Sequence, residues 1–364
     1  MKIKYVCPIN DASGYAEASR MNVLGLLSAG VEVTIGDASF EGHSADLGED
    51  WAKIAPLINK PLNYDTVVVH LTPNNYPRFM EEGKRMIGIT VWETSKIAED
   101  WVDPCNAMSQ IIVPCRQNVD AFVSAGVTVP IKMVPHAITV PDIEPAEIAG
   151  TEGLYKFYSI FQWTGRKNPL GLLKAYYSEF SMSDPVCLVL KTYLDFMQPM
   201  QEQEQEIASA IMSVKQMCGL RQAPRVVLIV ERMKKEDLFA LHGGCDCFVL
   251  PHKGEGFGIP IAEAMALGKP VIATTFGGPK DFLNKRNGFP IDYTLTPVYG
   301  MSWIPQYTVK QWWAEPDLKQ VAMSMRRAFS DQSYSVELGK QAAEDMKEYS
   351  IGKVGKQLAE VLCP

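Results

Sequence analysis

Short apolar runs, separated by amphipathic stretches and turn residues, recur along the first third of the chain and predict buried strands that alternate with helices. The predicted strands are Ile3–Pro8, Val31–Ile35, Thr66–Leu71, Met86–Trp92, Ile111–Pro114 and Ile131–Val134. A loop at Asn10–Tyr15 leads into a helix that Gly30 ends. This alternation favours a parallel sheet with helices on both faces.

A second series of the same kind begins at Tyr155, after residues 137–153, which contain two prolines and several acidic residues and show little periodicity. Its predicted strands are Lys156–Phe161, Val186–Lys191, Arg225–Val230, Cys247–Leu250 and Pro270–Ala273, with helices at about 168–179, 200–218, 235–242 and 259–267. With 364 residues, 47% of them hydrophobic, the chain can bury two cores. We therefore predict an α/β protein of two Rossmann-like, doubly wound domains, residues 1–150 and 151–344.

Charge and composition narrow the possible partners. A net charge of −7 disfavours a broad electrostatic grip on nucleic acid or anionic lipid. No apolar run reaches the roughly 20 residues that span a bilayer, and the first residues lack the apolar core of a secretion signal. Eight cysteines without metal-ligand spacing and only five histidines give a metal centre little support. We expect a cytoplasmic protein with reduced thiols, no metal and no integral membrane segment.

The strongest chemical signal lies at residues 254–268, where Glu255 and Glu263 are eight positions apart across a glycine-rich turn that runs into a helix. Pro260 suits the start of that helix and Gly268 suits the position after its end. The turn follows one predicted strand and precedes another, which is where open α/β sheets bind ligands. Glycines allow close approach of a ligand, and the helix N-terminus attracts anions. The pattern predicts a cleft for a phosphorylated sugar, with the diphosphate between the two acids.

The run from Glu255 to Ala273 resembles the Glu-x7-Glu signature of the retaining glycosyltransferases of family 4. Val134–Ile138 is similar to the end of that family's first domain, and Arg166–Pro169 with the following helix is similar to the start of its second. The first sixty residues and residues 290–310 match least. The resemblance implies the GT-B fold, with an acceptor-side domain at 1–150, a donor domain at 151–344, and a C-terminal helix, about 345–364 within the amphipathic stretch Ser335–Leu362, that returns to the first domain.

The resemblance also implies roles for individual residues. Glu263 would accept hydrogen bonds from the ribose of a nucleotide-diphosphate sugar, and Glu255 would face the transferred sugar. Arg166 and Lys167 would neutralise the leaving diphosphate. The other residues implied near the donor are Gly14, Tyr15, Arg232, Met233, Gly256, Phe257, Gly258 and Gly278.

The chain departs from the family pattern at two positions. Gln162 stands where relatives have an arginine, which places more of the diphosphate charge on Arg166. Where many relatives have a histidine at a strand end of the first domain, this chain has Trp92 or Glu93, so Glu93 is a candidate catalytic residue. The sequence contains no Asp-x-Asp, and metal-independent transfer without a further cofactor is expected.

The acceptor stays open between a saccharide, a lipid-linked glycan and other molecules. The sequence leaves three competing hypotheses: a nucleotide-sugar 2-epimerase of the same fold, a binding module without turnover, and a transferase that acts on a modified nucleic-acid base. The last receives no support from the negative net charge.

Overall fold

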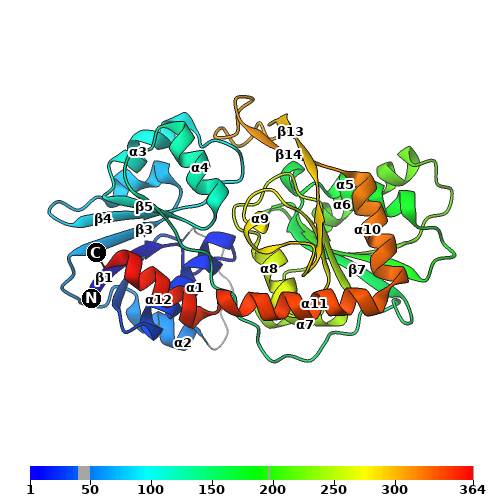
Figure 1. Cartoon of the computed structure of the whole chain (residues 1–364), viewed down its shortest axis with the longest axis horizontal. Helices are drawn as coiled ribbons and strands as arrows, with labels where there is room; N and C mark the ends of the chain where they lie inside the picture. The colour runs from blue at the N-terminus through cyan, green and yellow to red at the C-terminus, as the bar shows by residue number, and fades with distance from the viewer. Residues whose placement is uncertain (40–49, 196, 364) are drawn as a thin grey trace.

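The computed structural model describes residues 1–39, 50–195 and 197–363. Two six-stranded sheets form two domains that lie next to each other, the N-terminal one in blue and cyan and the C-terminal one mainly in green and yellow (Figure 1). All strand pairs within both sheets are parallel, and helices connect the strands. The predicted class, α/β with two doubly wound domains, is confirmed.

The first sheet has the strand order β2-β1-β3-β4-β5-β6. Its elements are β1 (Lys2–Cys7), α1 (Gly14–Ser28), β2 (Glu32–Asp37), α2 (Trp51–Ile54), β3 (Thr66–His70), β4 (Arg85–Ile89), α3 (Val102–Asn106), β5 (Gln110–Val113), α4 (Arg116–Ala125) and β6 (Ile131–Met133). After β1 the chain forms β2 on one side of β1, and it then forms β3 on the other side of β1. The loops that follow β1 and β3 therefore diverge at the carboxyl edge of this sheet.

The second sheet has the order β12-β11-β10-β7-β8-β9. Its elements are β7 (Tyr155–Gln162), α5 (Pro169–Glu179), β8 (Val186–Tyr193), α6 (Met200–Met217), β9 (Arg225–Ile229), α7 (Lys235–Gly244), β10 (Cys247–Leu250), α8 (Ile259–Ala266), β11 (Val271–Thr274), α9 (Pro279–Phe282) and β12 (Phe289–Ile291). Here the strand order reverses between β7 and β10.

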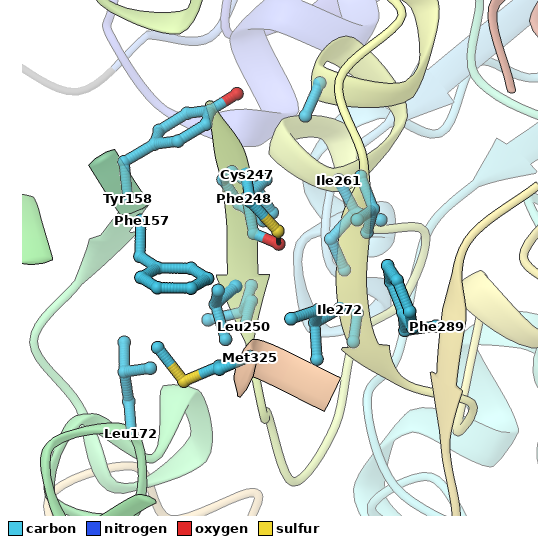
Figure 2. Packing of buried hydrophobic residues seen from close by; sticks show 14 of the residues in the cluster. Phe157, Tyr158, Leu172, Cys247, Phe248, Leu250, Ile261, Ile272, Phe289 and Met325 are labelled. Carbon is cyan, nitrogen blue, oxygen red and sulfur yellow. Dashed lines mark hydrogen bonds between the residues drawn. The ribbon is translucent and has the colours of Figure 1, made fainter. Parts of the chain in front are cut away.

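Each domain has its own hydrophobic core. In the N-terminal domain, buried side chains pack on both faces of the sheet, because its central strands β3, β4 and β5 carry runs of consecutive apolar residues. In the C-terminal domain, β7, β10 and β11 contribute Phe157, Phe248 and Ile272 to a core that Leu172 and Met325 close from helices (Figure 2). Burial of this apolar surface is the main force that holds each sheet to its helices.

A hairpin and two helices follow the second sheet, and the sequence patterns did not predict the hairpin. Strands β13 (Tyr293–Pro297) and β14 (Trp312–Pro316) pair antiparallel, and we call residues 293–316 the arm. Figure 1 shows the arm in yellow and orange at the top of the molecule, between the two domains. Helices α10 (Leu318–Ser330) and α11 (Gln332–Met346) come next.

The last helix, α12 (Ile351–Leu362), packs against α1 of the N-terminal domain. Gly25 and Gly355 let the two helices approach so closely that a Cβ on either residue would overlap the other's backbone. The amphipathic stretch Ser335–Leu362 contains parts of two helices rather than one. Ser350 has an extended backbone (φ −64°, ψ 153°), and this separates α11 from α12. The chain thus crosses between the domains twice.

One predicted strand is shorter than expected. The sequence extends a strand to Trp92, whereas β4 ends at Ile89. The cause is Asn118, whose amide oxygen accepts from the Trp92 backbone N–H at 2.9 Å and whose amide nitrogen donates to the Trp92 carbonyl at 2.6 Å. These bonds replace a strand ladder, and Glu93 consequently lies on a loop that faces the second domain.

Candidate functional site

Two loops of the C-terminal domain meet where its strand order reverses, which is the position at which open α/β sheets bind ligands. One loop follows β7 and carries Arg166 and Lys167, and the other follows β10 and carries Glu255. Asn168 joins them: its side-chain nitrogen donates to the carbonyl of Pro251 at 2.9 Å, and its side-chain oxygen caps α5 by accepting from Gly171.

The second loop turns sharply into α8. Gly258 has a left-handed backbone with φ 90°, which a side chain would strain, and α8 begins at the next residue, with Pro260 as its second residue. Because Pro lacks an N–H, it is tolerated in the first turn of a helix. The backbone N–H groups of Ile261 and Ala262 both donate to the carbonyl of Gly258 at 3.0 Å, which closes the first turn of α8.

Four predicted site residues come together in one ion cluster. The Lys167 ammonium pairs with Oε1 of Glu255, and Nη1 of Arg166 lies 3.5 Å from Oε2 of the same carboxylate. Arg166 also donates to the carbonyl of Gly254 at 2.7 Å. Its Nη2 lies 3.5 Å from Oε1 of Glu93, which comes from the N-terminal domain. The cluster therefore spans both domains and contains two cations and two carboxylates.

The environment of this cluster sets its charges. Burial alone would raise the pKa of Glu255, but Lys167 and Arg166 outweigh it and lower the pKa to about 2. Burial lowers the pKa of Lys167, and Glu255 opposes that shift. The pKa of Arg166 is raised, since Glu93, Tyr307 and Glu255 together outweigh its burial. At neutral pH Glu255 is thus ionised beside two fixed cations, an arrangement that can stabilise charge on a diphosphate.

Glu263 lies in a second cluster with different neighbours. Its Oε2 is 4.0 Å from Nε2 of His242, a buried ring whose pKa burial lowers to about 3. Burial first, and then the negative charge of Glu17, raise the pKa of Glu263 to about 8, which Lys235 only partly opposes. Glu17 itself pairs with Lys235 across the domain boundary and with Arg20 at 2.9 Å. Glu263 is therefore mostly protonated at pH 7 in this structure.

The two domains touch directly beside the first cluster. A Cβ on Gly254 would overlap the carbonyl of Glu93, and a Cβ on Gly256 would overlap the side chain of Val91. The backbone N–H of Arg116 also donates to Asp281 at 2.8 Å across the same boundary. Two surface hollows, of about 750 and 630 Å³, lie beside β9 and beside the chain ends, and residues of neither cluster line them. The two domains are thus in direct contact beside the first cluster.

The remaining predicted residues divide into two groups. Gly14 begins α1, and the hydroxyl of Tyr15 lies 3.1 Å from Oγ1 of Thr90, at the end of β4. Gly278 donates its N–H to the carbonyl of Glu255 at 3.1 Å. These residues lie around the first cluster.

Three predicted residues are not among the members of the two ion clusters. The ring of Phe257 is buried against His136, with ring centroids 5.1 Å apart, so its backbone alone is left for a ligand. Arg232 is exposed and Met233 packs against the domain core, both after the edge strand β9.

Among the residues of these clusters that the sequence patterns did not predict are Glu17, Lys235 and Tyr307. The first two had no signal, because their pairing joins helices that are far apart in the chain. Tyr307 donates its hydroxyl to Oε2 of Glu93 at 2.9 Å. A signal for it was the density of aromatic residues in its segment, which holds Tyr293, Tyr299, Trp303, Tyr307, Trp312 and Trp313.

Among the described residues, none of the helices combines the length and the apolar character needed to cross a membrane. Residues 213–294 match the family "Glycosyl transferases group 1", and this region includes Glu255 and Glu263. A 46-residue segment is 52% identical to sucrose synthases from Melioribacter roseus and Nitrosomonas europaea. The segment is 12% of this chain, and the chain spans only 6% of the length of those curated relatives.

Solved structures resemble the whole chain. HepE from Anabaena, in complex with UDP and glucose, has a TM-score of 0.67 at 15% identity, covering 100% of this chain and 99% of that one. Sucrose-phosphate synthase from Thermosynechococcus elongatus has a TM-score of 0.71 at 15% identity, covering 100% and 98%. The trehalose-6-phosphate synthase OtsA has a TM-score of 0.69 at 11% identity, covering 100% and 99%. The fold is GT-B, as predicted.

Proposed function

We propose that this protein is a retaining, metal-independent glycosyltransferase that moves a sugar from a nucleotide-diphosphate donor, with UDP-glucose as the first donor to test. The observation that carries the proposal is the buried cluster of Arg166, Lys167 and Glu255 at the switch point of the second sheet, facing Glu93. The match of residues 213–294 to a glycosyltransferase family supports the enzyme class. The UDP and glucose bound to HepE support the donor class.

In this proposal each charged group has a role. Arg166 and Lys167, with the positive end of the α8 dipole, stabilise the negative charge that grows on the diphosphate as it leaves. Glu255, released from Lys167 when the diphosphate takes that cation, faces the donor sugar and stabilises positive charge at the anomeric carbon. Glu263 receives the ribose hydroxyls.

The step itself balances without a further reactant. The bond between the anomeric carbon and the β-phosphate oxygen breaks, and a bond from that carbon to the acceptor oxygen forms on the same face. The acceptor's hydroxyl proton leaves with the nucleoside diphosphate. In this proposal Glu93, on the opposite domain, orients the incoming hydroxyl. A cytoplasmic location and an acceptor of saccharide or lipid-linked type remain predictions from the sequence.

The test has two stages. Thermal shifts with UDP-, GDP-, ADP- and TDP-glucose identify the base, because a ligand that binds only the folded state raises the melting temperature. Release of the nucleoside diphosphate is then followed with an acceptor panel, with and without EDTA, and NMR of the product gives the anomeric configuration. We expect turnover that EDTA does not reduce and a retained configuration. An inverted product would refute the retaining mechanism.

The same assay separates the alternatives. A 2-epimerase converts the donor to its epimer without any acceptor, whereas a module without turnover shows binding and no release of nucleoside diphosphate. Glu255→Gln serves as the matched control for transfer, since it keeps the side-chain shape and removes the charge that faces Lys167 and Arg166.

A further inference from the structure

We propose that Tyr307, which the arm of the C-terminal domain carries, is a positioning residue for Glu93 of the N-terminal domain. Its hydroxyl holds one oxygen of the Glu93 carboxylate so that the other faces Arg166. The inference deepens the proposed function and rests on it: the arm completes the acceptor side of the site from the opposite domain.

The arm is anchored on the N-terminal domain close to Glu93. The backbone N–H of Ser95 donates to the carbonyl of Trp312 at 2.8 Å, and the N–H of Trp312 donates to Oγ of Ser95 at 2.9 Å. Lys310 pairs with Glu99 at 2.9 Å, although both side chains are exposed and this pair contributes little. The two reciprocal bonds fix the register of the arm on the loop that follows β4.

Tyr307 itself is held on two sides. Its ring stacks on Trp92, with ring centroids 4.8 Å apart and an angle of 29° between the planes. Trp92 is buried, and its indole N–H donates to Oγ1 of Thr94 at 2.6 Å. The indole ring of Trp92 also packs edge-on against the ring of Trp101. Because this platform cannot move without breaking those contacts, the Tyr307 hydroxyl has a fixed position 2.9 Å from Glu93 Oε2.

The contact between Tyr307 and Glu93 is linked to Glu255 through Arg166. The free oxygen of Glu93 lies 3.5 Å from Arg166, which in turn lies 3.5 Å from Glu255. Without the phenol, Glu93 would be able to turn both oxygens towards the guanidinium, which is the preferred geometry of such pairs. That bidentate pair would withdraw Glu93 from the acceptor. Tyr307 therefore keeps Glu93 available to the acceptor.

The experiment compares Tyr307→Phe with wild type, with the UDP-sugar and acceptor that the proposed assay identifies. The phenylalanine keeps the stack on Trp92 and removes only the hydroxyl. We expect kcat/KM for the acceptor to fall about 10- to 100-fold, the range that follows from losing a hydrogen bond to a charged group. We expect the Kd for UDP, which needs no acceptor, to change less than about threefold, since the phosphate-facing cations remain.

A matched control is available in the N-terminal domain. Tyr64 also donates its hydroxyl to a carboxylate, Glu81, at 3.0 Å, but it precedes β3 and so lies at the amino edge of the sheet, away from the loops of the site. Tyr64→Phe removes the same kind of bond and should leave kcat/KM unchanged. Its effect on the melting temperature also shows how much stability such a bond contributes.

A double-mutant cycle separates positioning from a structural role. If Tyr307 acts through Glu93, adding Tyr307→Phe to Glu93→Gln should cost less than about twofold further in kcat/KM. Independent, additive losses in the double variant would overturn the inference, as would a Tyr307→Phe enzyme that matches Tyr64→Phe. A wild type that transfers no sugar would instead overturn the proposed function, so the two failures are distinguishable.

Discussion

Replacing Glu263 by glutamine should stabilise the protein at alkaline pH while weakening its hold on a nucleotide sugar. In the described structure the carboxyl is buried beside His242 and near the ionised Glu17, and both burial and that negative charge oppose its ionisation. Glutamine has nearly the same shape and no charge to oppose. The substitution therefore removes a cost that the folded protein bears at every pH above the ordinary pKa of this carboxyl.

The size and sign of the change in the free energy of unfolding follow from the pKa of Glu263. The ordinary pKa of the carboxyl is 4.5, and in the folded protein it is raised to about 8. Between these two values the unfolded chain has lost the proton and the folded protein keeps it, so the free energy of unfolding falls as the pH rises. At about 1.36 kcal/mol for each pKa unit, the full cost above pH 8 is at most about 5 kcal/mol.

Calorimetry of wild type and Glu263→Gln at pH 5.5 and pH 8.5 measures the effect. We expect the variant to melt higher at pH 8.5, by about 4 °C or more if at least about 2 kcal/mol is recovered, with a smaller gain at pH 5.5. Titration calorimetry with UDP-glucose at pH 8.5, where Glu263 is mostly ionised, should show affinity at least about 10-fold weaker in the variant, because the ribose loses bonds to a charged acceptor.

The control variant, Glu255→Gln, should shift the melting temperature in the opposite direction. Lys167 and Arg166 lower the pKa of Glu255, so Glu255→Gln leaves two buried cations without their partner and should lower the melting temperature. A Glu263→Gln variant that is less stable than wild type at pH 8.5, or equally shifted at both pH values, would refute the reasoning about this carboxyl.

Three further predictions follow from the contacts. Glu255→Gln should reduce transfer at least about 100-fold with a smaller change in UDP affinity, and equal losses in turnover and affinity would contradict its role at the sugar. Gly256→Val should prevent the close approach to Val91, so that small-angle scattering gives a larger radius of gyration than for wild type, whereas an unchanged radius would show that the domains close without this contact. Gly355→Leu should overpack the contact with Gly25 and lower stability by about 1 to 3 kcal/mol, measured by urea unfolding, and a neutral result would mean that α12 shifts freely on α1.

The alternation of apolar strands with helices was enough to predict both sheets, because parallel strands buried on both faces leave a strong sequence pattern. The Glu255 loop was also readable, since its glycines and its proline stand at positions that the turn into α8 requires. Asn118 shows where this reasoning stops. It ends β4 from 26 residues further along the chain, and no local pattern announces such a bond.

The arm escaped prediction for a different reason. Its strands are short and β13 is mostly exposed, and the buried hydrophobic side chains of its segment form only a small cluster with Phe276, made of Val298, Met301, Trp313 and Ala314. Contacts with the other domain anchor it further. The environment of Glu263 is non-local in the same way. The charge that raises its pKa belongs to Glu17, on a helix at the opposite end of the sequence. Sequence patterns identified the acid but carry no information on its ionisation.

The partnership of α1 with α12 also bears on how the chain matures during synthesis. Helix α1 is made within the first thirty residues, yet the surface around Gly25 finds its partner only when residues 351–362 have emerged. At roughly 10 residues per second, the N-terminal sheet waits on the order of half a minute with that apolar strip uncovered. Chaperones that shield nascent chains have a defined target in this interval, and a ribosome stalled late in the message would yield a C-terminal domain that is complete and an N-terminal one that is not.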